Sequence, residues 1–150
     1  MDKIIDHLFV GSHADLISEV LDHYKINVVI CVLEDPHCLH RKENDGRDWI
    51  HIPIMRDIEL TGEDLYDEMD VGDHADPEAL DKISGIIEEA ILLKQNVLVH
   101  CAAGMERSPL TVAWYLRNKK HISLDKAYDI ITPKRHVFNR VMWLPPEYRR

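Results

Sequence analysis

The sequence has few cysteines, no long apolar run and fewer basic than acidic residues. Three cysteines in 150 residues do not suit a disulfide framework, and the odd number leaves room for a working thiol. The longest apolar runs, such as residues 28–33, have the length of a strand, whereas a membrane-spanning helix needs about 20 residues. Charged residues interrupt the first segment, MDKIIDHLFVGSH, which does not fit a secretory signal. We therefore expect a cytoplasmic protein without a membrane segment.

Basic residues number 18 against 27 acidic ones, which gives a formal net charge of −9. This balance argues against a protein that holds nucleic acid or an anionic membrane through its overall charge. Much of the negative charge lies in residues 57–76, which contain nine acids and no lysine or arginine. Such a run is typical of a solvated loop. The alternative is a loop that influences substrate choice.

Apolar residues make up 45% of the chain and charged residues 30%, a composition typical of a soluble globular protein. The length suits one domain, so we expect residues 1–150 to form a single domain. Runs rich in β-branched residues predict strands, and start signals before periodic apolar residues predict helices. The predicted strands are 27–33, 49–54 and 96–100, and the predicted helices are 12–24, 76–91, 124–131 and one beginning at Ser108-Pro109. Their alternation predicts an α/β fold with a central sheet flanked by helices on both faces.

The segment HCAAGMERS, residues 100–108, follows a predicted strand and precedes a predicted helix. Sites in such folds gather at the carboxyl ends of strands. Small residues and Gly104 allow a tight loop here, and successive backbone N–H groups in such a loop form an anion-sized nest next to a helix N-terminus. The segment therefore predicts a phosphate-binding loop.

Cys101 and Arg107 are the reactive side chains of this loop. Helix N-termini and neighbouring cations favour the thiolate form of a cysteine, and the thiolate is the nucleophile. The planar guanidinium of Arg107 can hold two phosphate oxygens at once, which lysine cannot do. The alternative is that Cys101 is an inert buried cysteine and Arg107 a surface ion-pair partner.

HCAAGMERS resembles the HCxxGxxRS loop of the dual-specificity phosphatases, within the cysteine-based tyrosine phosphatase superfamily. Other segments resemble the same family in the same order. LFVGS is similar to its early strand and turn, IHIPI to the strand before its general-acid loop, VLVHC to its phosphate-loop strand, and SPLTVAWYLRNKKHISLDKAYDII to its helix pair. The resemblance covers residues 4–144, and it implies a dual-specificity phosphatase-like α/β fold.

The resemblance implies that Cys101 is the nucleophile and that Arg107 clamps the phosphate. It makes Ser108 the hydroxyl that stabilises the departing thiolate, with a helix N-cap as the alternative, and His100 the residue that orients the loop, with an ordinary buried histidine as the alternative. Glu106 departs from the family, whose relatives usually carry a small residue there. The residues that supply cradling amides are Ala102, Ala103, Gly104, Met105 and Glu106.

The resemblance also places a general acid after the IHIPI strand, where Asp57 lies. A carboxyl group must protonate the leaving oxygen and then activate water. Relatives have one residue between the Pro-Ile pair and this acid, whereas here there are two, Met55 and Arg56. Asp70 and Asp73 are therefore alternatives.

These observations favour a phosphatase that acts on phosphotyrosine, and also on phosphoserine or phosphothreonine, in proteins or peptides through a phosphocysteine intermediate. We expect no metal and no cofactor. Two alternatives stay open: the same chemistry on a phosphoinositide, an RNA 5′-phosphate or a phosphorylated sugar, and a phosphate-binding module without catalysis. Cys31, near the end of a strand that can neighbour Cys101, is either a core residue or a partner for a reversible disulfide.

Overall fold

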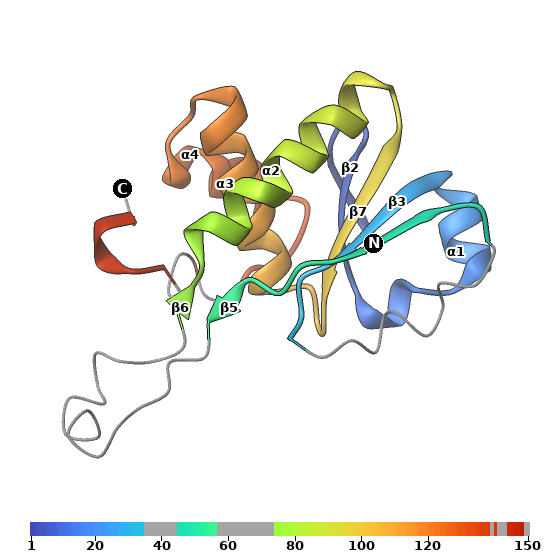
Figure 1. Cartoon of the computed structure of the whole chain (residues 1–150), viewed down its shortest axis with the longest axis horizontal. Coiled ribbons are helices and arrows are strands. Elements are labelled where there is room, and N and C mark those ends of the chain that lie inside the picture. Colours follow the sequence, from blue (N-terminus) through green and yellow to red (C-terminus); the bar gives the residue numbers. More distant parts are fainter. Residues whose placement is uncertain (35–44, 57–73, 139, 141–143, 149–150) are drawn as a thin grey trace, which may run out of the picture.

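The computed structural model describes residues 1–34, 45–56, 74–138, 140 and 144–148. Within these residues strands and helices alternate along the chain (Figure 1). The strands are β1 (Asp2–Ile5), β2 (Leu8–Ser12), β3 (Ile26–Cys31), β4 (Asp48–His51), β5 (Met55–Arg56), β6 (His74–Ala75) and β7 (Asn96–Cys101). The α-helices are α1 (Ser18–His23), α2 (Pro77–Leu92), α3 (Arg107–Lys120) and α4 (Leu124–Ile131), and the 3-10 helices are η1 (His13–Asp15) and η4 (Pro146–Tyr148).

The central sheet has five strands in the order β1-β2-β7-β3-β4. Strands β2, β7, β3 and β4 run parallel, and β1 pairs antiparallel with β2 at the edge. In the middle of the sheet Val99 of β7 pairs with Val10 of β2 on one side and Ile30 of β3 on the other. Because the parallel strands end at the same edge, the residues that follow β2, β3 and β7 meet there. The predicted α/β class with a central sheet flanked by helices is confirmed.

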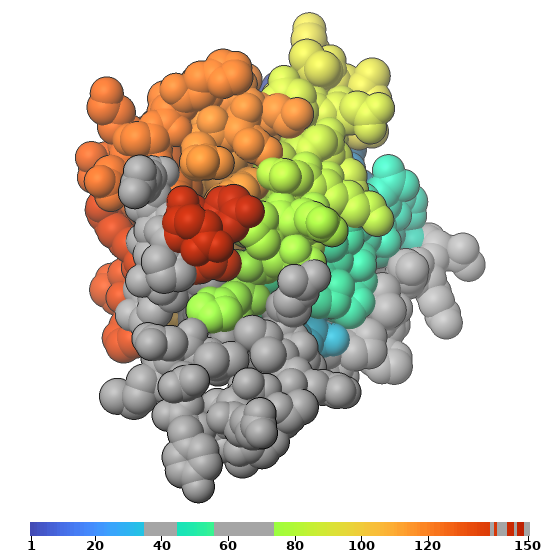
Figure 2. Space-filling model, turned by 60° about the vertical axis from the view of Figure 1, so that its left-hand side comes forward, coloured from blue at the N-terminus to red at the C-terminus, as the bar shows by residue number. Residues whose placement is uncertain are grey.

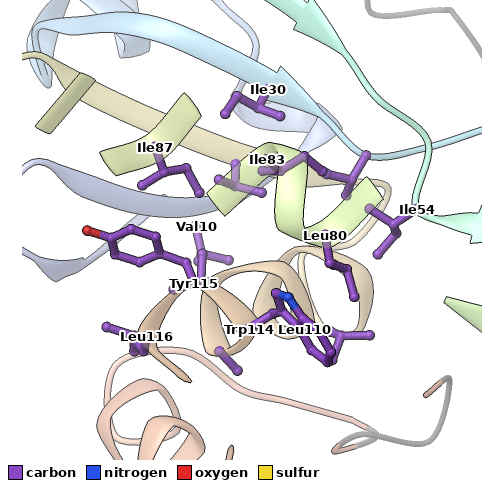
Figure 3. Packing of buried hydrophobic residues seen from close by; sticks show 14 of the residues in the cluster. Val10, Ile30, Ile54, Leu80, Ile83, Ile87, Leu110, Trp114, Tyr115 and Leu116 are labelled. Atoms are coloured by element: carbon purple, nitrogen blue, oxygen red, sulfur yellow. The ribbon is translucent and has the colours of Figure 1, made fainter. Parts of the chain in front are cut away.

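Helices cover the two faces of the sheet unequally. α2, α3 and α4 lie together on one side, and α1 lies on the other (Figure 1). Figure 3 shows Ile83 and Ile87 of α2 pointing into the space between the sheet and α3, where Val10 and Leu110 also lie. The side chains of these residues are almost entirely buried. The larger core therefore lies on the α2–α3 side and holds these helices against the strand that leads to Cys101.

Helix α2 forms where the sequence predicts it. The Asp76 carboxylate accepts a hydrogen bond from the Glu78 N–H at 3.0 Å, and Pro77 occupies the first turn, where its missing N–H costs nothing. Ser123 caps α4 in the same way, because its hydroxyl accepts from the Lys126 N–H at 3.2 Å. Both helices therefore begin where the sequence predicts them.

The predicted helix over residues 12–24 is wrong as a single helix. Asp15 accepts hydrogen bonds from the N–H and hydroxyl of Ser12, which closes only the 3-10 turn η1. The backbone at Ile17 is then extended, with φ −116° and ψ 134°, and the short helix α1 starts after it. The start signal was real, but it belongs to a turn that leads the chain away from the end of β2.

The last described residues pack on the helical layer. Residues 144–148, drawn in red, lie against α2 and the orange helical region in the space-filling view (Figure 2). The Tyr148 ring lies 5.9 Å from the Trp114 ring of α3, measured between centroids. Among the described residues, no helix has the length and apolar character needed to span a membrane.

Candidate active site

Cys101 is the last residue of β7, the middle strand of the sheet. Only 4% of the residue is exposed. The chain then forms a loop and enters α3 at Arg107, as the sequence predicts for a phosphate-binding loop. The thiol thus lies at the carboxyl edge of the sheet, between the end of a buried strand and the first turn of a buried helix.

Two groups approach the Cys101 sulfur. The Gly104 N–H donates to Sγ at 3.2 Å, and the Ser108 Oγ lies 3.3 Å from it. Ser108 Oγ also lies 3.4 Å from the Gly11 carbonyl oxygen at the end of β2. One hydroxyl proton serves one acceptor at a time, so Ser108 can donate to the sulfur when the sulfur is charged and to Gly11 when it is not.

The N-cap interpretation of Ser108 is wrong. The N-cap position of α3 belongs to Glu106, and Ser108 is the second residue of the helix. Its side chain is fully buried and directed at Cys101 and Gly11. Ser108 therefore belongs to the surroundings of the thiol.

Gly104 is the turning point of the loop. Its φ of +71° lies in the left-handed region that favours glycine. A Cβ at this position would lie 2.6 Å from the Gly11 carbonyl oxygen and would collide with the Arg135 guanidinium. The loop can therefore approach β2 and Arg135 closely only because residue 104 has no side chain.

Four successive carbonyl groups of the loop, from residues 102 to 105, accept hydrogen bonds from outside the loop. A trans peptide places each carbonyl opposite the N–H of the next residue, so we infer that the N–H groups of residues 103–106 face the other side, where the cavity lies. The four bonds are His13 N–H to Ala102 at 3.0 Å, Arg135 Nη2 to Ala103 at 3.2 Å, Arg135 Nε to Gly104 at 2.9 Å, and Phe138 N–H to Met105 at 2.9 Å.

A cavity of about 390 Å³ opens in front of the loop. Phe138 contributes an aromatic side chain that is 67% exposed. The wall is mostly apolar, with one guanidinium and one carboxyl group. Its lining residues are Cys101, Ala102, Ala103, Met105, Glu106, Arg107 and Phe138.

Arg107 points to an acid that the sequence did not single out. Its Nη1 donates to the Glu34 carboxylate at 3.0 Å, and the two side chains are 29% and 39% exposed. Glu34 follows β3, the strand next to β7. Since the pair is partly open to solvent, it stabilises the fold weakly, by at most about 1 kcal/mol. The guanidinium is thus held near the loop by a partly exposed ion pair with the end of the neighbouring strand.

Comparison with known proteins shows the family of this chain. The family model described as "Dual specificity phosphatase, catalytic domain" matches residues 8–144. The chain belongs to the dual specificity phosphatase family. This range contains the whole loop, β7, α3 and the residues that hold the loop carbonyls.

Two curated relatives carry the same family name. Dual specificity protein phosphatase 7 of Homo sapiens is 37% identical over 141 residues, which cover 89% of this chain and 28% of that protein. Dual specificity protein phosphatase 9 of Homo sapiens is 36% identical over 85 residues, covering 52% of this chain and 21% of that protein. The chain thus spans less than a third of the length of these two relatives.

Solved structures share the fold of this phosphatase domain. The crystal structure of PTPMT1 superposes with a TM-score of 0.72 at 18% identity, covering 99% of this chain and 92% of the other. The crystal structure of human DUSP28 superposes with a TM-score of 0.67 at 19% identity, covering 99% and 90%. At these identities the similarity shows the fold alone.

His100 of the phosphatase domain is fully buried and pairs in register with Gly11 and Cys31 of the neighbouring strands. Its Nδ1 lies 3.4 Å from the Cys101 carbonyl oxygen, at the start of the loop. Burial lowers the pKa of His100 from 6.5 to about 4, so the imidazole is neutral at pH 7. A neutral ring beside this carbonyl is consistent with the predicted orienting role, which stays a prediction.

The geometry is against a Cys31–Cys101 disulfide. Cys31 pairs with His100, not with Cys101, and consecutive residues of a strand point to opposite faces of the sheet. Accordingly Cys31 packs in the cluster on the α1 side, whereas Cys101 packs on the α2–α3 side. Joining the two would require β7 or β3 to turn over, so Cys31 is a buried core residue of the phosphatase domain.

The predicted general acid Asp57 and its alternatives Asp70 and Asp73 lie outside the described residues. The described chain stops at Arg56 and resumes at His74, and these two residues pair in the β5–β6 ladder. The sequence motif predicts the contiguous loop of the phosphatase. The motif does not predict Glu34, Arg135 and Phe138, because these residues come from distant parts of the chain and belong to no motif.

Proposed function

We propose that this phosphatase domain hydrolyses phosphate monoesters through a phosphocysteine intermediate on Cys101, with phosphotyrosine in proteins or peptides as the preferred substrate. The observation that carries the proposal is the Cys101 thiol at the base of a loop whose carbonyls at residues 102–105 bond outward. Such a loop presents its amides to an anion in front of the sulfur. Family membership agrees with this chemistry.

In the first step the Cys101 thiolate attacks phosphorus and forms an S–P bond while the P–O bond to the leaving group breaks. The leaving oxygen takes a proton from a general acid, for which we propose Asp57, with Asp70 and Asp73 as alternatives. The loop amides and the Arg107 guanidinium bind the three equatorial oxygens, where negative charge gathers during transfer. No redox step and no added co-reactant are involved.

In the second step water attacks phosphorus, the S–P bond breaks, and the sulfur leaves as a thiolate. The same acid, now ionised, accepts a proton from the water, and inorganic phosphate departs. Ser108 lies 3.3 Å from the sulfur and can donate a hydrogen bond to the departing thiolate. We assign Ser108 to this step because a buried hydroxyl with a second acceptor nearby needs no large movement to switch partners.

The choice of a phosphotyrosine substrate rests on the cavity in front of the loop. Phe138 and Met105 provide apolar surface in its lining, which suits an aromatic ring. Among the residues that the structure describes, no lysine lines the cavity, and Arg107 is accompanied there by Glu106. A polyanion such as a phosphoinositide or a 5′-phosphorylated RNA needs further cations, so these substrates rank second.

A substrate panel tests the proposal. The values of kcat/KM are measured for a phosphotyrosine peptide, the same peptide with phosphothreonine, a phosphoinositide in mixed micelles and a 5′-phosphorylated RNA. We expect the phosphotyrosine peptide to be turned over fastest. Faster turnover of the phosphoinositide or the RNA contradicts the substrate assignment but leaves the chemistry intact, whereas phosphate binding without any turnover contradicts the chemistry itself.

A further inference from the structure

Arg135 lies behind the phosphate-binding loop, four residues after the end of α4. Its side chain is only 14% exposed. All three guanidinium nitrogens are engaged. Nε donates to the Gly104 carbonyl at 2.9 Å, Nη2 to the Ala103 carbonyl at 3.2 Å, and Nη1 to the Asp2 carboxylate at 2.9 Å.

These bonds fix the direction of two consecutive peptide groups. With the carbonyls of Ala103 and Gly104 held toward Arg135, the N–H groups of Gly104 and Met105 point away from it. The Gly104 N–H indeed reaches the Cys101 sulfur at 3.2 Å. A cation on the carbonyl side also polarises each peptide group, which strengthens its N–H as a donor to an anion. Arg135 therefore acts on the phosphate through the backbone of the loop, without touching it.

Asp2 holds the Arg135 guanidinium in this position. It lies in β1, the antiparallel edge strand. The neighbouring residue Lys134 donates to the Ile4 carbonyl of the same strand. The segment 134–135 is thus hydrogen-bonded to β1 at two points, and Arg135 of this segment is hydrogen-bonded to the loop. The edge strand, which contributes no residue to the cavity, is in this way coupled to the direction of the loop amides.

We propose that Arg135 is the positioning residue of the phosphate-binding loop, held in place by Asp2. The inference rests on the proposed function in so far as it names the loop's ligand as a phosphate. A merely structural arginine would lower stability on replacement and leave the anion affinity of the folded protein unchanged. Replacing a positioning residue, in contrast, lowers the affinity of the folded protein for a phosphate-like anion in addition to any loss of stability.

The test compares four variants with wild type: Arg135→Met, Arg135→Lys, Asp2→Asn and the control Arg117→Met. Arg117 stacks on the Trp114 ring at 4.8 Å on α3, and within the described part of the chain no hydrogen bond or ion pair joins it to the loop, so its replacement matches the chemical change at Arg135. For each protein the dissociation constant of orthovanadate is measured by titration calorimetry. The midpoint of thermal unfolding and the kcat/KM for an aryl phosphate are measured alongside.

We expect Arg135→Met to weaken orthovanadate binding by about tenfold or more, since two charge-assisted hydrogen bonds to the loop are lost. Arg135→Lys restores part of the affinity because an ammonium can still donate to one carbonyl. Asp2→Asn weakens binding by a smaller factor of about 2–5, as the guanidinium keeps its carbonyl bonds but loses a partly buried ion pair. Arg117→Met binds orthovanadate as wild type does.

Wild-type affinity in folded Arg135→Met overturns the proposal, as does an equal loss in Arg117→Met. If Arg135→Met does not fold, Arg135→Lys and Asp2→Asn decide, and wild-type affinity in both is the contradicting result. Failure of the proposed function is a separate outcome: wild type would bind orthovanadate and turn over no phosphate ester. The calorimetric comparison stays valid in that case, because it needs no turnover.

Discussion

In the proposed mechanism, Ser108 is the residue whose loss should affect the two chemical steps differently. Its hydroxyl lies 3.3 Å from the Cys101 sulfur and is fully buried. We predict that Ser108→Ala slows hydrolysis of the phosphocysteine by about 10–100-fold and slows its formation less, since one hydrogen bond to a charged group is worth about 1.5–3 kcal/mol. Pre-steady-state kinetics with an aryl phosphate then shows a burst of the phenol that wild type lacks.

Ser84→Ala is the matched control for that change. Ser84 is equally buried in α2, and within the described part of the chain its hydroxyl has no hydrogen-bond partner. Its removal leaves both steps at the wild-type rate. A burst in both variants, or in neither, contradicts the role given to Ser108.

Asp57 is expected to deliver the proton to the leaving oxygen. Replacing it with asparagine should lower turnover of a phosphopeptide by roughly 10²–10⁴-fold, and should lower turnover of an activated aryl phosphate much less, because that leaving group needs little protonation. Steady-state kinetics on both substrates measures the difference. Near-normal Asp57→Asn activity, with a collapse in Asp70→Asn or Asp73→Asn, moves the assignment to that residue.

His100 makes the stability of the fold depend on pH. Burial lowers its pKa from 6.5 to about 4. The unfolded chain therefore takes up a proton as the pH falls through 6.5, while the folded chain stays neutral there until about pH 4. The contribution of His100 to the stability of the fold is fully present above pH 6.5 and is lost as the pH falls toward 4.

Between pH 7.5 and pH 5 this one histidine should account for a loss of about 2 kcal/mol in the free energy of unfolding. Urea denaturation at the two pH values measures the loss in wild type and in His100→Gln. The variant should lose less than wild type by that amount. An identical pH dependence in the two proteins would show that His100 is not buried in its neutral form.

At the scale of the elements, helix α2 joins the sheet to α3. Ile83 is completely buried between them (Figure 3), whereas Leu92 at the end of the same helix is 72% exposed. We predict that Ile83→Ala lowers the free energy of unfolding by about 2–5 kcal/mol. Leu92→Ala should change it by about 0.5 kcal/mol or less. Chemical denaturation of both variants measures this, and equal losses would contradict the packing of α2.

The helices and strands could be predicted where a few neighbouring residues in the sequence mark their ends. Asp76-Pro77 and Ser123 mark helix starts within a few residues, and both act as caps in the structure. The sequence predicts a longer helix from Ser12 because a capping box looks the same before an α-helix and before a 3-10 turn. Strand β6 escaped prediction because it has two residues and pairs with β5 across 17 intervening positions.

Over the whole molecule, some residues of the site carry a local sequence signal and others do not. The segment from Cys101 to Ser108 is contiguous, so its motif revealed the thiol, the arginine and the hydroxyl together. Glu34 and Arg135 reach the loop from distant parts of the chain, and single arginines and glutamates are common on any surface. The sheet order, with β7 between β2 and β3, brings Glu34 next to the loop, and the segment after α4 brings Arg135 there.

The most direct test of the account is to trap the phosphorylated enzyme. Wild type, Cys101→Ser and Cys31→Ser are mixed with a ³²P-labelled phosphotyrosine peptide, quenched within milliseconds in acid, and digested for mass spectrometry. We predict label on the peptide that contains Cys101 in wild type and Cys31→Ser, and neither label nor turnover in Cys101→Ser, since an unaided serine hydroxyl is too weakly acidic to attack. Turnover that survives in Cys101→Ser, or label on any other residue of wild type, would contradict a phosphocysteine mechanism at this loop.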